Sequence, residues 1–211
     1  MNITKFYSKL TKDSEVSMYI KVPVLTFSSW LFQGILYMDK TEKAFKFFFD
    51  MLLFIILALF LNLYLNSFPA LCIALLLSHT FNWIFNGQIF VLMKNLKLIR
   101  TDIKDFNQYI TNLKKKAENE KSIYIISLIG SLSRDELKET SDLDIRIIRK
   151  KGFINGIGAC MFTMTERSKA FFNKFPLDIY VGDNLKFLKK VDEQSIIIFK
   201  DGEYCEILSK E

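Results

Sequence analysis

Small and acidic residues cluster at two neighbouring points of this chain, and their types and spacing could bind metal ions and a triphosphate. Gly130 and Ser131 directly follow the apolar run Ile123–Ile129, which predicts a strand. Asp142 and Asp144 open a second apolar run, and side chains two apart on a strand point to the same face. Gly130 permits close approach of the backbone to a ligand, and Ser131 with its neighbouring amides can bind a phosphate. The sequence therefore predicts a metal and triphosphate site between these strands.

This arrangement resembles the nucleotidyltransferases of the DNA polymerase β superfamily, in particular their minimal, single-domain branch. The family pattern has Gly-Ser after a strand, Arg three residues after the Ser, and Ser-Asp-x-Asp opening the next strand. The matching residues here are Gly130, Ser131, Arg134, Ser141, Asp142 and Asp144. Asp135 stands where many members have Gly, and Asp178, in the apolar segment Phe175–Val181, matches the family's third carboxylate. The resemblance covers roughly residues 101–181.

The resemblance implies transfer of a nucleoside monophosphate from a triphosphate to an acceptor, with release of pyrophosphate. Asp142 and Asp144 are expected to bridge two divalent ions, Mg²⁺ or Mn²⁺, while Asp178 binds the ion that activates the acceptor and takes its proton. The expected nucleotide-binding residues are Gly130, Ser131, Arg134 and Ser141. The plainer alternative is that the Asp-x-Asp pair lies on a solvated strand edge and does no chemistry.

Apolar residues are concentrated in the first half of the chain. Of the 211 residues 50% are hydrophobic, yet between residues 45 and 93 only Lys46 and Asp50 are charged. We therefore expect an N-terminal cytoplasmic or interfacial segment over 1–44, a transmembrane helical hairpin over 45–93 and a nucleotidyltransferase domain over 94–211. The predicted fold is an α+β core, a mixed β-sheet flanked by helices, preceded by a transmembrane two-helix hairpin.

Two apolar runs, Phe47–Leu65 and Pro69–Met93, each approach the roughly 20 residues that cross a bilayer as a helix. Positive residues flank both ends: Lys40, Lys43 and Lys46 before the first run, and Lys94, Lys97, Arg100 and Lys104 after the second. This pattern predicts a cell-membrane protein with two spans, both termini and the catalytic domain being cytoplasmic. Anionic lipid accounts for the net charge of +6, so nucleic acid is not an expected partner. A buried hairpin in a soluble protein is the alternative.

The remaining pattern predicts further elements around these two parts. Val22–Met38 is apolar but interrupted, which favours an interfacial helix over a re-entrant one. Helical stripes are predicted over 101–121 and 162–175, the second leading back to the strand with Asp178. Gln194–Lys200 and Glu203–Leu208 predict a terminal β-hairpin. The three cysteines have no metal or disulfide spacing.

Polar residues inside the apolar hairpin offer the only clue to the acceptor. His79, Asn82 and Asn86 fall on one helical face, and folding of the hairpin brings Asp50 opposite them. They could seat the headgroup of a lipid-linked acceptor, or they could pin the two helices or a homo-oligomer together. Two rival functions also stay open: a protein-modifying nucleotidyltransferase of toxin–antitoxin type, and a catalytically idle membrane scaffold.

Overall fold

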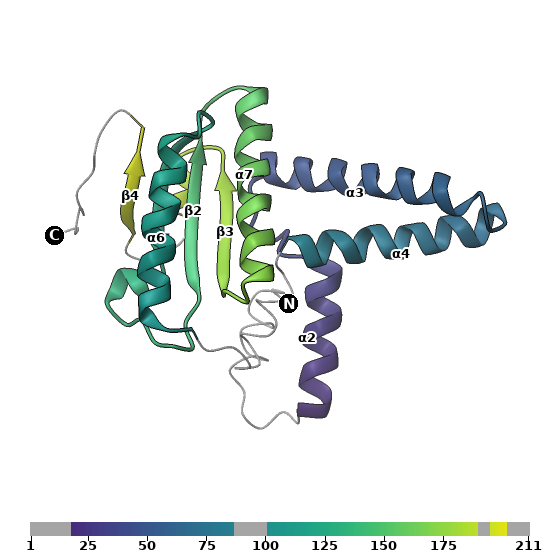
Figure 1. Ribbon diagram of the computed structural model, residues 1–211, viewed down its shortest axis with the longest axis horizontal. Helices are drawn as coiled ribbons and strands as arrows, with labels where there is room; N and C mark the ends of the chain where they lie inside the picture. Colours follow the sequence, from purple (N-terminus) through teal and green to yellow (C-terminus); the bar gives the residue numbers. More distant parts are fainter. Residues whose placement is uncertain (1–17, 87–100, 190–194, 202–211) are drawn as a thin grey trace.

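The computed structural model describes residues 18–86, 101–189 and 195–201. It consists of an α/β domain and a long helical hairpin that projects away from one edge of it (Figure 1). The expected lysines and arginine at 94, 97 and 100, the end of the second apolar run at Met93, and the predicted strand Glu203–Leu208 lie outside the described residues.

The sheet has four strands: β1 (Ile123–Ile129), β2 (Leu143–Arg149), β3 (Leu177–Gly182) and β4 (Ile196–Lys200), in the order β3-β2-β1-β4. β2 runs antiparallel to β1 and parallel to β3, and β4 pairs antiparallel with the other side of β1. The sheet is therefore mixed, as predicted. The predicted first strand of the terminal hairpin exists as β4, and its partner in the described structure is β1.

Two helices, α6 (Ile103–Glu118) and α7 (Phe153–Phe172), cover one face of the sheet. The core between them contains Phe106 and Leu113 from α6 and the inward residues of the central strands, which are fully buried. Alternation along β2 produces this arrangement, because Leu143, Ile145 and Ile147 all point to the helices. A 3₁₀ turn, η1 (Leu132–Arg134), and a short helix, α8 (Lys186–Lys189), complete the domain.

Helix α7 begins nine residues earlier than the predicted helix 162–175, and this part of the prediction was wrong. The glycines at 152, 156 and 158 suggest a loop by sequence alone. In the fold, Gly156 and Gly158 let neighbouring segments approach: a Cβ at Gly156 would lie 3.0 Å from the Thr41 methyl group, and one at Gly158 would lie 3.0 Å from Ser122. These two glycines therefore lie inside a helix because the segments with Thr41 and Ser122 pack closely against it.

The hairpin consists of α3 (Lys40–Leu61) and α4 (Ser67–Phe85), preceded by α2 (Met18–Phe32). By length and composition α3 and α4 could each cross a membrane, and only 6% of the most apolar stretch of α3 is buried. Helix α3 begins at Lys40 rather than near Phe47, and Asn66 precedes α4 at the predicted turn. Helix α2 ends at Phe32, where Gln33 and Gly34 adopt positive φ, so the apolar run to Met38 is not one helix.

The base of α3 is attached to β3, the edge strand of the sheet, through buried polar contacts. Glu42 accepts a hydrogen bond from the Val181 backbone N–H at 2.7 Å and an ion-pair contact from Arg167 at 2.5 Å. Arg167 also donates to the carbonyl oxygen of Ile179. These side chains satisfy backbone groups that an edge strand otherwise leaves unpaired. The contacts therefore fix the start of the hairpin against the domain.

Candidate active site

Two of the three predicted carboxylates are direct neighbours in the sheet. Asp144 on β2 and Asp178 on β3 are register partners in the parallel pair, so their side chains leave the same face at adjacent positions. Asp142 stands just before β2 and two residues from Asp144, which gives it the same direction. All three are half-buried, whereas Leu143 and Ile145 are fully buried on the opposite face. The strand register therefore brings the predicted acidic residues to one edge of one face.

The Gly130–Ser131 turn lies directly beside these carboxylates. Ile129, the last residue of β1, is the register partner of Asp144, and Gly130 follows with φ of 78°. A Cβ built on Gly130 would overlap the carboxylate of Asp144. The turn then continues into η1, where the Ser133 hydroxyl donates to the Gly130 carbonyl oxygen at 2.8 Å. Only glycine both adopts this backbone conformation without strain and leaves room for the Asp144 carboxylate, because it has no Cβ.

Gly130→Ala is therefore expected to damage the site and the fold together. The left-handed backbone costs an alanine about 1–2 kcal/mol, and the methyl group also displaces the Asp144 carboxylate. We expect nucleotidyl transfer to fall sharply and the unfolding temperature to drop. The matched control is Gly158→Ala, a helical glycine remote from the carboxylates where an added Cβ is also crowded, at 3.0 Å from Ser122, so it controls for a packing defect away from the site. Activity of Gly130→Ala equal to that of this control would contradict the arrangement.

The Ser131 hydroxyl is buried without a hydrogen-bond partner among the residues that the structure describes. A buried polar atom normally has a partner, because leaving it unpaired costs about 1–3 kcal/mol. This atom lies in the small-residue turn next to the acidic residues. An oxygen of a bound phosphate would supply the missing partner, so the turn fits the anionic group that the sequence predicts there.

Arg134 and Ser141 have other contacts in this structure. The Arg134 side chain, 41% exposed, lies 3.2 Å from the Glu136 carboxylate, and the Ser141 hydroxyl accepts a hydrogen bond from the Lys138 backbone at 3.0 Å. Asp135 adopts the left-handed conformation, with φ of 56°, which explains why a glycine suits that position in the family. A nucleotide role for Arg134 and Ser141 stays a prediction.

The three carboxylates provide the oxygen ligands that Mg²⁺ and Mn²⁺ prefer, but they do not converge on one point. Within residues 18–86, 101–189 and 195–201, no group of three His, Cys, Asp or Glu side chains is close enough to hold a metal ion. Repulsion between like charges favours such separation. The register of Asp144 with Asp178 and the position of the Asp144 carboxylate beside Gly130 still place these two carboxylates next to the Gly130–Ser131 turn. The donor set fits divalent ions in its chemistry.

Comparison with known families supports the assignment that this geometry suggests. Residues 111–204 match the family described as Polymerase beta, Nucleotidyltransferase. The matched range contains the Gly-Ser turn, all three carboxylates and the whole four-stranded sheet. A search of curated proteins finds no match for this chain. The domain is thus supported as a nucleotidyltransferase domain of the polymerase β superfamily, with a nucleoside triphosphate as its implied substrate and nucleotidyl transfer as its general activity.

Sequence reasoning missed three residues on the face of the sheet that carries the predicted carboxylates. Arg146 follows Asp144 by two residues, and its guanidinium lies 4.6 Å from the ring centre of Tyr180, which follows Asp178 by two. The half-exposed ring of Tyr37, from the segment between α2 and α3, lies 6.2 Å from the Tyr180 ring. Extending the alternation beyond the carboxylates would have found Arg146 and Tyr180. No sequence pattern indicated Tyr37, because it lies between α2 and α3, far in the chain from the strands that carry the carboxylates.

The position of Tyr37 beside the carboxylates affects the protonation of its phenol. Burial is the main cause that raises the pKa of Tyr37, the negative charge of Asp178 raises it further, and Arg146 acts in the opposite direction. Burial and then Asp178 also raise the pKa of Tyr180. Both phenols therefore remain protonated at neutral pH and can donate hydrogen bonds beside Asp178.

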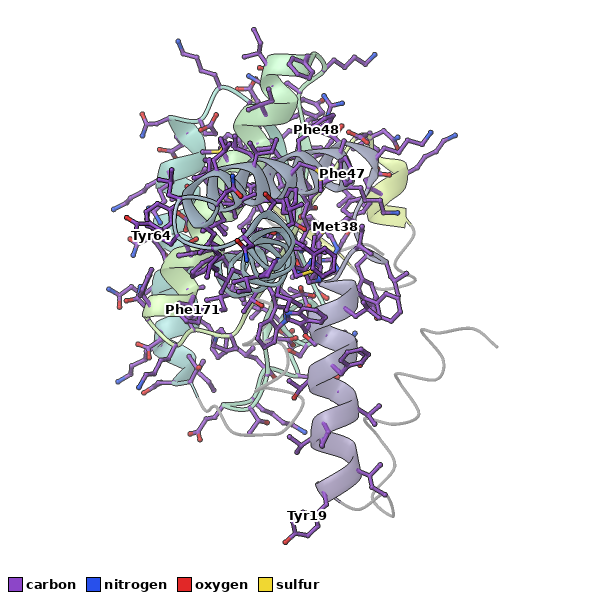
Figure 2. All side chains as sticks on the ribbon, turned by 90° about the vertical axis from the view of Figure 1, so that its right-hand side faces the viewer. Tyr19, Met38, Phe47, Phe48, Tyr64 and Phe171 are labelled. Atoms are coloured by element: carbon purple, nitrogen blue, oxygen red, sulfur yellow. The ribbon has the colours of Figure 1, made fainter. Side chains whose placement is uncertain are left out.

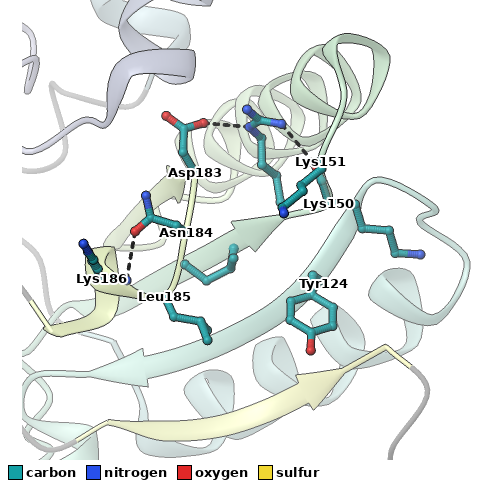
Figure 3. Close-up of a pocket in the computed structure, with 9 residues that line it drawn as sticks. Tyr124, Lys150, Lys151, Asp183, Asn184, Leu185 and Lys186 are labelled. Atoms are coloured by element: carbon teal, nitrogen blue, oxygen red, sulfur yellow. Dashed lines mark hydrogen bonds and ion pairs between the residues drawn. The ribbon is translucent and has the colours of Figure 1, made fainter.

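A cavity of about 680 Å³ lies on the same side of the sheet, at the opposite ends of β2 and β3 (Figure 3). Its lining includes the apolar side chains of Tyr124, Ile148 and Leu185 and the basic residues Lys150, Lys151 and Lys186. None of the predicted carboxylates lines it. Arg149 and Asp183 form an ion pair at 2.7 Å in its wall (Figure 3). The cavity is therefore separate from the carboxylate cluster.

The polar residues of the hairpin hold helices together. The His79 ring lies between Asp50 on α3, at 3.3 Å, and the Trp30 carbonyl oxygen on α2, at 3.0 Å. Asn86 donates to Asn82, and its carbonyl oxygen accepts from Arg167 on α7 at 3.2 Å. These contacts are those of the helix-pinning alternative. Binding of an acceptor by Asp50, His79, Asn82 and Asn86 stays a prediction.

Proposed function

We propose that this protein transfers a nucleoside monophosphate from a nucleoside triphosphate to a membrane-associated acceptor and releases pyrophosphate. The observation that carries the proposal is the register of Asp144 with Asp178 beside the Gly130–Ser131 turn. A hydroxyl or phosphate oxygen of the acceptor attacks the α-phosphorus, and the bond between that phosphorus and the β-phosphate oxygen breaks. A lipid-linked molecule is the acceptor that we favour.

Each residue of the site has a role that follows from its position. The Ser131 hydroxyl and the backbone of the turn bind the departing phosphates, because that hydroxyl is buried and has no described partner. Asp178, at the start of the edge strand, accepts the proton of the attacking group. Divalent ions held by Asp142, Asp144 and Asp178 would neutralise phosphate charge and stabilise the entering and leaving oxygens.

Membrane anchoring rests on the surface of the hairpin. Both helices expose large apolar side chains around their circumference, including Phe47, Phe48 and Leu59, and Figure 2 shows such side chains around the hairpin viewed end-on. Water-exposed apolar surface on this scale is characteristic of contact with lipid or another protein. Both ends of the hairpin lie at the domain, so the nucleotidyltransferase domain and its triphosphate share one side of the membrane. The lysines in the first two turns of α3, Lys40, Lys43 and Lys46, favour the cytoplasmic side.

The proposal is tested with the full chain reconstituted in nanodiscs that contain total lipid extract. Each of the four ribonucleoside triphosphates, labelled at the α-phosphate, is supplied with Mg²⁺ or Mn²⁺, and pyrophosphate is measured. We expect one triphosphate to release pyrophosphate and its label to enter the lipid fraction, where mass spectrometry identifies the product. Label on protein would instead favour the protein-modifying alternative. Absence of pyrophosphate under every condition would favour the idle scaffold.

A further inference from the structure

Helix α7 exposes a stripe of apolar side chains that the sheet does not use, interrupted in the second half of the helix by Thr165 and Ser168. Ile154 is 82% exposed, Ile157 41%, Met161 44% and Phe172 71%. Their spacings of three, four and eleven residues place them on one face of a helix with 3.6 residues per turn. Ala159, Thr163 and Ala170, which face the domain, are buried. The stripe therefore points away from the core, with three apolar side chains in the first half of the helix and Phe172 at its end.

The stripe is continuous with the base of the hairpin. Ser168 lies on the same face of α7, and its hydroxyl donates to the Phe85 carbonyl oxygen at the end of α4, at 3.1 Å. On the neighbouring face, Arg167 contacts Asn86, which caps α4. The exposed apolar residues of α7 therefore lie on both sides of Ser168, the point where the end of α4 contacts the domain.

Helix α7 also runs across the hairpin axis. In Figure 1 α7 is vertical while α3 and α4 are horizontal, and the end-on view of Figure 2 again shows α7 running crosswise beside the hairpin. A bilayer crossed by α3 and α4 would therefore have its surface parallel to α7. Lys151 and Lys174, at the two ends of α7, are exposed, and their charge suits anionic headgroups at that surface.

We propose that the exposed stripe of α7 lies in the headgroup region of the same bilayer, as a second membrane contact of the nucleotidyltransferase domain. This inference rests on the membrane anchoring proposed above. Lipid is the occupant because the stripe continues from the hairpin base, runs parallel to the bilayer surface and has basic residues at both ends. The contact adds a second attachment of the domain to the bilayer, beside the hairpin that Glu42 and Arg167 already fix to the domain, and keeps the carboxylate cluster at one height above the membrane.

Spin labels test this contact in the full chain reconstituted in nanodiscs of phosphatidylcholine and phosphatidylglycerol. The background carries Cys72→Ala, Cys160→Ala and Cys205→Ala, and single labels are placed by Ile157→Cys, by Ile154→Cys as a second position, and by two references. Ile103→Cys, on α6, is the matched control, because Ile103 is 45% exposed and lies on the other cover helix. Leu59→Cys reports the hairpin, since Leu59 is 69% exposed on α3.

We expect the labels at 154 and 157 to be several-fold more accessible to oxygen, relative to a water-soluble nickel relaxant, than the label at 103. A water-like result at 154 and 157 with a lipid-like result at 59 would overturn the α7 contact while leaving membrane anchoring intact. A water-like result at 59 would overturn the anchoring and the α7 contact with it. Shielding of 154 and 157 from both relaxants would show that protein covers the stripe, which also overturns the proposal.

Discussion

Asp144→Asn is expected to reduce the rate of pyrophosphate release by about 10²-fold to 10³-fold, the loss typical when one group that stabilises the transition state is removed. Asp144 is the central carboxylate of the site: it pairs in register with Asp178, follows Asp142 by two residues and lies over Gly130. Asparagine keeps its shape and removes its charge, so ligation of divalent ions weakens while packing is preserved.

The fold of Asp144→Asn should remain intact, because the substitution relieves repulsion among neighbouring carboxylates. Thermal unfolding followed by near-ultraviolet circular dichroism checks this, and activity is measured with saturating triphosphate. Asp105→Asn is the control, since Asp105 is an exposed carboxylate in the first turn of α6. Equal activity of the two variants would show that Asp144 is no part of the catalytic centre.

Arg167→Met is expected to destabilise the protein by about 3–5 kcal/mol, because it leaves the Glu42 carboxylate buried without its positive partner. Arg167 is 4% exposed and Glu42 3% exposed, and the pair joins α7, α3 and the edge strand β3. For a chain of this size such a loss corresponds to a fall in unfolding temperature of roughly 6–20 °C.

Two further variants distinguish loss of the buried ion pair from a general effect of substituting a basic residue on α7. Lys169→Met, two residues further along α7 with a side chain 53% exposed, should change the unfolding temperature little, because its buried partner Glu166 keeps Lys116 at 2.8 Å and the Tyr109 hydroxyl at 3.0 Å. Adding Glu42→Gln to Arg167→Met should recover part of the lost stability, because no buried charge then remains. An unfolding temperature of Arg167→Met equal to that of Lys169→Met would show that the pair does not hold the hairpin to the domain.

Much of the domain follows from local pattern. The mostly apolar run Ile123–Ile129, followed by Gly130, predicts β1. Alternation after Ser141 predicts β2 with Leu143 inside and Asp144 on the other face, as observed. The apolar runs likewise predict α3 and α4 as two helices joined by a short turn. The spacing of apolar residues and the residue types at turns are local properties, so a short stretch of sequence is sufficient to reveal them.

The limits of local pattern are clearest where an element's boundary depends on a partner. The glycines at the start of α7 indicate a loop until Thr41 and Ser122 are seen packed against them. The polar stripe of α4 was compatible with acceptor binding and with helix pinning; the contacts of His79 with Asp50 and with α2 match the second. In both cases the contacts come from residues far away in the chain, and acceptor binding by the polar residues of the hairpin stays a prediction.

The sequence by itself determined the parts from which the candidate site is built: a glycine-serine turn, three acidic residues at or beside apolar strands, and a long apolar hairpin. Residue type and spacing express these parts directly. Only the tertiary structure decided that Asp144 and Asp178 are register partners, since pairing of β2 with β3 is a contact across the crossover helix α7. It also decided that Tyr37 and Arg146 share the face of these carboxylates, and that Glu42 and Arg167 join the hairpin to the edge strand. Such contacts depend on packing between distant segments, which no local pattern encodes.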